Sequence, residues 1–201
     1  MAGDGLRERK KRETRIALSW AAVRLTVERG YDNVRVEDIA AAVGVSPRTF
    51  NNYFASKGEA ITTRHLDRAV LIADELRGRP ADEPLWEAIT NAVLGRFGMG
   101  QDDSGADQQW VDGVRLMVGN PALQTDFIRA NAAAEAEIAA AIAERTGTDL
   151  TRDLYPKLVA GVVGSAITVA MEHWQRADPP AAMGPLLRDA LRQLAAGLPV
   201  P

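Results

Sequence analysis

Two short helices separated by a tight turn are the sequence feature that most restricts the fold of this chain. Apolar residues recur at helical spacing over residues 36–43, and Gly44 ends that helix. Ser46 and Pro47 then have the residue types of a helix start, because serine caps free N–H groups and proline at the first position loses no hydrogen bond. A third helix is expected over residues 47–53. Two short helices joined in this way form a helix-turn-helix.

The second helix of this motif has an apolar side and a polar side. Ile39, Val45 and Phe50 are expected to form a small core, which turns the polar residues outward. Arginine binds guanine, asparagine binds adenine and threonine meets a thymine methyl group or a phosphate, so the outward side fits the major groove of DNA. The DNA-binding residues that we predict are Arg35, Ser46, Pro47, Arg48, Thr49, Asn51, Asn52, Tyr53 and Lys57, of which Arg35, Tyr53 and Lys57 are expected at phosphates.

Charge is divided unevenly along the chain. The first 64 residues contain 12 Lys+Arg and 8 Asp+Glu, a net charge of +4, whereas the remaining residues carry −7. Six basic residues gather over residues 7–15, directly before the helix over residues 16–29. A basic head on an acidic body favours an anionic partner for the head alone.

The head resembles the DNA-binding region of TetR-type transcriptional regulators. The resemblance lies in the string ERGYDNVRVEDIAAAVGVSPRTFNNYFASKGEAI, residues 28–61, and in weaker form begins at Arg12, so that it covers about a quarter of the chain. It differs from the family pattern at Thr26, where the family often has Phe, at Arg35, where it usually has Thr, and at Asn51, where an aromatic residue is common. The resemblance implies a dimer that binds a palindromic operator on double-stranded DNA and that a small molecule releases.

The rest of the chain is also expected to be helical. Aromatic residues make up 5% of the chain and the apolar positions recur at helical rather than strand-like spacing. We therefore predict an all-α protein of about nine helices, with a helix-turn-helix domain over residues 1–56 and a ligand-binding and dimerisation domain over residues 57–201. The expected helices of the second domain cover residues 57–76, 83–97, 106–118, 121–145, 151–176 and 182–198.

The last two expected helices carry the signal for a homodimer. One has a stripe of small residues and the other a seam of leucines, and so wide an apolar face on a terminal helix needs a cover on both sides. A second copy of the same surface is the expected cover, with two-fold symmetry. The predicted interface residues are Ala160, Gly164, Thr168, Leu187, Leu191 and Leu194.

A pocket for a small lipophilic effector is expected in the second domain, as the resemblance implies. Large apolar residues and two amides lie along its helices, although core packing explains each of them as well. The predicted ligand-binding residues are Trp86, Asn91, Phe97, Trp110, Met117, Phe127 and Met171.

Several function classes are not expected. The chain has no cysteine, and His65 and His173 do not have metal-ligand spacing, so we expect no metal and no cofactor. Its longest apolar stretch, residues 158–171, is too short for a bilayer, and its first residues are charged, so a cytoplasmic protein is expected. No catalytic motif indicates an enzyme. A ligand-responsive repressor is the prediction; the alternatives are a helical adaptor that has lost DNA binding and, third, an all-α enzyme.

Overall fold

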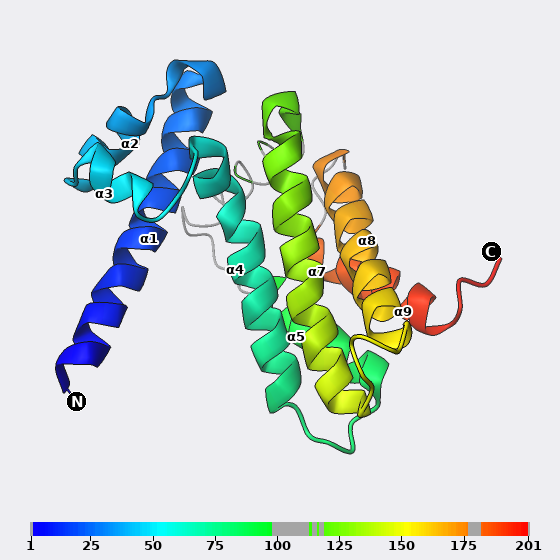
Figure 1. Cartoon of the computed structure of the whole chain (residues 1–201). Helices are drawn as coiled ribbons and strands as arrows, with labels where there is room; N and C mark the ends of the chain where they lie inside the picture. The colour runs from blue at the N-terminus through cyan, green and yellow to red at the C-terminus, as the bar shows by residue number, and fades with distance from the viewer. Residues whose placement is uncertain (1, 98–112, 114–115, 117–118, 177–181, 201) are drawn as a thin grey trace. The chain divides into compact units, whose positions relative to one another are not determined.

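The computed structural model describes residues 2–97, 113, 116, 119–176 and 182–200, with side chains from Gly5 onward. Every regular element in these ranges is a helix, which confirms the all-α prediction (Figure 1). In chain order the elements are α1 (Ala2–Arg29), η1 (Tyr31–Asn33), α2 (Val36–Val43), α3 (Pro47–Asn51), α4 (Lys57–Gly78), α5 (Leu85–Phe97), η3 (Pro121–Leu123), α7 (Gln124–Thr146), α8 (Tyr155–Arg176) and α9 (Met183–Ala195).

The chain divides into two compact units. The first comprises residues 1–64 and 104–130, and the second comprises residues 65–103 and 131–201. The predicted boundary after residue 56 lies just before the first residue of α4, whereas the units divide inside α4, between Arg64 and His65. Each unit therefore contains part of α4 and part of α7.

In the first unit, the basic segment at residues 7–15 is helical and continuous with the rest of α1. Figure 1 shows this helix running past α2 and α3 toward the N-terminus. The C-terminal half of α1 packs on α2, and α2 packs on α3. The core of the unit is mostly apolar and includes the fully buried side chains of Leu18, Ile39, Phe50, Phe54 and Ile61.

In the second unit, α9 packs against both α5 and α8. Ion pairs join the neighbouring helices at the surface: the Arg77 Nε lies 2.9 Å from the Glu144 Oε2, which ties α4 to α7. The guanidinium of Arg145 donates to the carbonyl oxygens of Arg79, Pro80 and Glu83, so it holds the loop between α4 and α5.

Helix ends differ from the predicted ends where local hydrogen bonds compete with the helix. The eighth expected helix begins at Tyr155 rather than 151, because the Asp149 carboxylate accepts from the backbone and hydroxyl of Thr151 in a turn. These hydrogen bonds also hold the pKa of Asp149 below its ordinary value. The ninth ends at Ala195, since Gly197 and Leu198 both have positive φ, 79° and 53°. Most of the helix expected over residues 106–118 lies outside the described residues.

Candidate nucleic-acid interface and internal cavity

The turn between α2 and α3 has the geometry that its residues predict. Gly44 has φ 74° and ψ 30°, the left-handed conformation that ends many helices. Its N–H donates to the Ala41 carbonyl, and the Val45 N–H donates to the Ala40 carbonyl at 3.0 Å. Nothing lies within 4 Å of the position that a Cβ at Gly44 would take, so the backbone conformation alone requires glycine here.

The start of α3 is fixed by a serine cap. The Ser46 Oγ accepts a hydrogen bond from the Thr49 N–H at 3.1 Å and lies 2.9 Å from the Thr49 Oγ1. Pro47 occupies the first turn, as predicted. Phe50 is completely buried and its ring centroid is 5.6 Å from that of Phe54, which anchors this five-residue helix to the core. The rotation of α3 is therefore set by one aromatic side chain.

That rotation places most of the predicted base-reading residues on the surface. Pro47, Arg48, Asn51 and Asn52 are exposed, and Thr49 is half-buried. Tyr53 follows the helix and is half-buried, with its ring 6.5 Å from that of Phe54. A short helix with arginine, amide and hydroxyl groups on its outer side presents the donors and acceptors that base edges pair with in the major groove.

Arg35 stands at the N-terminus of α2, where it offers no hydroxyl for capping. Its own backbone N–H donates instead to the Asp38 Oδ2 at 2.8 Å, so half of a capping box remains. The Arg35 side chain is exposed. It remains a candidate for a phosphate contact at the edge of the motif.

Lys57, which is predicted to contact a phosphate, makes internal contacts in this structure. Its Nζ donates to the carbonyl oxygens of Tyr31 and Val34, at 2.5 and 2.9 Å, and lies 3.9 Å from the centroid of the Tyr31 ring. These contacts tie the first residue of α4 to the segment between α1 and α2. They direct the ammonium group toward the protein, so in this conformation Lys57 supports the motif instead of reaching outward.

Capping hydrogen bonds of Ser56 and Glu59 fix the start of α4. The Glu59 N–H donates to the Ser56 Oγ at 3.0 Å, and the Glu59 carboxylate accepts from the Ala55 N–H at 2.6 Å. Beside it, a Cβ on the buried Gly58 would lie 1.9 Å from the Asp126 Oδ2 and 3.3 Å from the Tyr31 hydroxyl oxygen. Burial and the negative charge of Asp126 raise the pKa of Tyr31.

The described residues that were predicted to bind a ligand differ in their exposure and their contacts. Asn91 is exposed and donates to the Glu83 Oε1 at 2.8 Å, Trp86 is half-buried and Met171 is buried. Phe127 is half-buried and belongs to the first unit. Phe97 lines a small cavity of the second unit. The other two predicted residues, Trp110 and Met117, lie outside the described residues.

The cavity beside Phe97 lies among α4, α5, α7 and α8 of the second unit. Its volume is about 20 Å³, enough for a single water molecule. Apolar and polar side chains share its wall, which is lined by His65, Arg68, Ala69, Ile72, Phe97, Asn131, Ala134, Glu135, Ile138, Gly164 and Ile167.

A chain of hydrogen bonds crosses the cavity wall. The His65 Nε2 lies 3.1 Å from the Asn131 Oδ1, and the Asn131 Nδ2 donates to the Glu135 Oε1 at 2.8 Å. Burial lowers the pKa of His65, an effect to which Arg68 adds and which Asn131 and Glu135 oppose. The imidazole is therefore neutral at pH 7, as expected for a packed histidine.

Asn131 and Glu135 are polar cavity residues that the sequence reasoning did not select. They are four residues apart and therefore neighbours on α7, within a run of alanines. Their one distinguishing signal was that each interrupts that apolar run. The Arg68 guanidinium lies 4.7 Å from the centroid of the Phe97 ring on the same wall.

The predicted dimer residues divide between two sides of α8 and α9. Ala160, Leu187 and Leu191 have no exposed surface, so they belong to the core of the second unit. A Cβ on Gly164 would lie 3.3 Å from the Glu135 Oε1, which places this glycine on the cavity side. Thr168 is half-buried and donates to the Gly164 carbonyl. Leu194 lies on the other side, which we call the open side.

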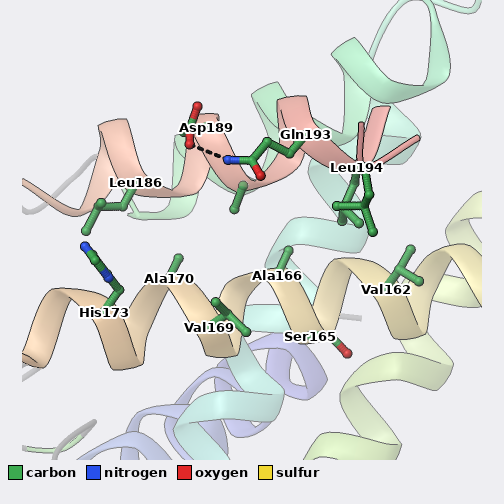
Figure 2. A pocket seen from close by; sticks show the side chains of 12 residues that line it. Val162, Ser165, Ala166, Val169, Ala170, His173, Leu186, Asp189, Gln193 and Leu194 are labelled. Carbon is green, nitrogen blue, oxygen red and sulfur yellow. Dashed lines mark hydrogen bonds between the residues drawn. The ribbon is translucent and has the colours of Figure 1, made fainter. Parts of the chain in front are cut away.

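The open side is an apolar groove of about 540 Å³ between α8 and α9 (Figure 2). Val169, Leu186 and Leu194 line it, together with His173 and small residues of α8. Val169 is 63% exposed, an unusual position for a valine on a helix so apolar. At the rim, the Asp189 carboxylate accepts hydrogen bonds from Arg192 and from the Gln193 amide, which lower its pKa.

Among the described residues, no group of three or more His, Asp or Glu side chains is placed to hold a metal ion. No helix of the described part of the chain combines the length and the apolar character that crossing a bilayer requires.

The chain matches known proteins over both units. Residues 20–59 match the family described as bacterial regulatory proteins, tetR family, and residues 83–199 match the MftR C-terminal domain. The chain is 37% identical over 182 residues to the HTH-type transcriptional regulator TcmR of Streptomyces glaucescens, covering 88% of this chain and 80% of TcmR. It is 28% identical over 195 residues to a mycofactocin biosynthesis transcriptional regulator, MftR, of Mycobacterium tuberculosis, covering 94% and 93%.

A solved structure shares the fold. It is the TetR-family repressor FadR of Thermus thermophilus in complex with lauroyl-CoA, which aligns with a TM-score of 0.59 at 21% identity and covers 93% of this chain and 96% of that one.

Proposed function

Because the chain belongs to the TetR family of bacterial transcriptional regulators, we propose that it is a cytoplasmic, homodimeric repressor that a small lipophilic molecule releases from a palindromic operator. The carrying observation is α3: Phe50 holds the helix from below while Arg48, Asn51 and Asn52 stand exposed above it. Two such helices, related by two-fold symmetry, would meet successive major-groove faces about 34–36 Å apart.

Binding to DNA is tested with the duplex that flanks the gene of this protein. In a gel-shift titration, wild type should form a salt-sensitive complex that unlabelled duplex of the same sequence displaces better than scrambled duplex. Arg48→Ala should reduce that preference, since a lost bidentate contact to guanine costs about 1–3 kcal/mol of discrimination. Arg152→Ala, at an exposed arginine of the second unit, is the control of equal charge. A wild-type protein with no sequence preference would favour the adaptor alternative.

The groove between α8 and α9 supports the proposed dimer. A contiguous apolar surface of this kind is covered in most proteins, and an identical groove on a second copy would cover it with leucines and small residues that allow close helix approach. Val169→Glu should therefore dissociate the dimer in analytical ultracentrifugation. Ile128→Glu, at a similarly exposed apolar residue of α7 (67%), should leave the mass unchanged.

The cavity beside Phe97 supports the proposed effector site. FadR of Thermus thermophilus was solved with lauroyl-CoA, and we propose that an acyl or aromatic ligand uses this cavity here. A space of about 20 Å³ must enlarge before such a ligand enters, so the ligand would favour a conformation with its helices further apart. That change in the population of conformations is the proposed cause of operator release.

The effector proposal is tested with lauroyl-CoA as the first probe. We expect it to raise the melting temperature of wild type and to weaken the operator complex. Gly164→Val would place a larger side chain against Glu135 and should reduce both effects, whereas Gly161→Val, whose Cβ would meet nothing within 4 Å, should leave them unchanged. Equal responses of the two variants would place the ligand elsewhere.

A further inference from the structure

The N-terminal half of α1 and the α3 region line one groove. Its volume is about 530 Å³, and its wall consists of Arg7, Glu8, Lys10, Lys11, Thr14, Thr49, Asn52 and Tyr53. All of these residues belong to the first unit. The groove thus lies between the basic segment at residues 7–15 and α3, although that segment is not part of the helix-turn-helix motif.

The spacing of the α1 residues explains why they share a wall. Counted from Arg7, the other residues of this wall follow at three, four and seven positions: Lys10, Lys11 and Thr14. This spacing places all four along one side of a helix. From Arg7 to Thr14 this stripe is about 10 Å long at 1.5 Å per residue. Thr49, Asn52 and Tyr53 have the same three- and four-residue spacing on the facing wall.

The charges of the groove select an anion. Three of the eight lining residues are cations, and Glu8 is the one acid among them. Among the described residues, no ion pair engages Arg7, Lys10 or Lys11. On the other side of the same helix, Arg9 lies 3.6 Å from Glu13, so part of the positive charge there is already compensated.

We propose that this groove holds the phosphodiester backbone of the DNA strand beside the major groove that α3 reads. Phosphates on one strand recur every 3.4 Å of the duplex axis, so a cationic stripe of about 10 Å can face two or three of them. The hydroxyl and amide groups of Thr49, Asn52 and Tyr53 would donate to the same phosphates from the opposite wall. In this arrangement Asn52 and Thr49 hold the backbone, and Arg48 and Asn51 read bases. The inference rests on the proposed function and adds residues to its DNA contact.

Two double variants distinguish DNA binding by the cations of the groove from a general effect of the positive charge of α1. Lys10→Ala with Lys11→Ala removes two cations from the groove, and Arg9→Ala with Arg12→Ala removes two from positions on the same helix outside its wall. Fluorescence anisotropy with a labelled duplex of scrambled sequence, between about 50 and 200 mM salt, gives the dependence of affinity on salt for each protein.

Lys10→Ala with Lys11→Ala should make the slope of log affinity against log salt less steep by about 1.8 for each bound protomer. The loss of affinity relative to wild type should be about tenfold larger at about 50 mM salt than at about 200 mM. The control double variant should change the slope by less than half as much. Equal changes in the two variants, or no change in either, would overturn the proposal.

Replacing the acidic residue of the groove should change DNA affinity in the opposite direction. Glu8→Gln should increase DNA affinity at low salt, because it removes the one negative charge near the proposed phosphates, whereas Glu13→Gln should not. Lower affinity after Glu8→Gln would contradict the proposal. If wild type binds no duplex with sequence preference, the proposed function fails; if it does and the groove variants match wild type, only this inference fails.

Discussion

Replacing Lys57 by methionine should separate a structural role of this lysine from a role at DNA. The substitution keeps most of the aliphatic stem and removes the ammonium group that donates to the Tyr31 and Val34 carbonyls and lies over the Tyr31 ring. Each of the two hydrogen bonds is worth about 1 kcal/mol at a part-buried site. The cation–π contact adds about 0.5–1 kcal/mol.

These contributions predict a loss of about 2–3 kcal/mol of unfolding free energy, or about 4–12 °C in melting temperature for a chain of this size. Urea denaturation followed by circular dichroism measures the loss. Lys157→Met, at an exposed lysine of α8, should change stability by less than about 0.5 kcal/mol.

A Lys57→Met protein as stable as wild type, whose DNA affinity nevertheless depends less steeply on salt, would contradict the structural role of Lys57. That combination would mean that the ammonium leaves the two carbonyls and neutralises a phosphate in the complex, with a decrease of about 0.9 in slope for each protomer. The urea denaturation and the DNA titration are both carried out at a temperature at which each variant is fully folded without urea.

Three further predictions concern single residues. Gly58→Ala should lower the unfolding free energy by about 1–3 kcal/mol, because its methyl group would displace the Asp126 carboxylate, and a melting temperature equal to wild type would contradict this. Gly44→Ala meets no neighbour, so chemical denaturation should show only the cost of the left-handed backbone, about 1–2 kcal/mol. Because burial lowers the pKa of His65, the unfolded chain binds more protons than the folded one below about pH 6.5, and the native state should lose stability as the pH falls through that range. Denaturation at several pH values should show a smaller loss in His65→Gln, and parallel curves would contradict the assignment.

Short-range signals predicted the helix-turn-helix well. The cap at Ser46, the left-handed Gly44 and the buried Phe50 each depend on residues within a few positions in the sequence. Such contacts are encoded by residue type and spacing alone. The same holds for the capping hydrogen bond between Ser56 and Glu59.

Long-range contacts could not be predicted in the same way. Lys57 meets carbonyl groups 23 and 26 positions earlier, and the chain of hydrogen bonds from His65 to Asn131 spans 66 positions. No local pattern shows which distant backbone turns toward a side chain. For this reason, residue type suggested a phosphate contact for Lys57 but gave no sign of its internal hydrogen bonds.

The sequence indicated only partly which side of an amphipathic helix is buried. The leucine seam of α9 was evident, but periodicity does not fix the centre of the buried arc. The structure turns Leu187 and Leu191 inward and leaves Leu186 and Leu194 toward the groove. Asn91 shows the same limit, since its partner Glu83 lies eight positions earlier, across the start of α5.

The continuity of α1 from Ala2 to Arg29 has a thermodynamic consequence for association. Basic tails that order only when they reach nucleic acid lose about 2–5 kcal/mol of their interaction energy to that ordering and bind with a large negative heat-capacity change. Here the cations are already spaced along a formed helix before any encounter. Calorimetry of complex formation should therefore show no heat-capacity contribution from folding of residues 5–15.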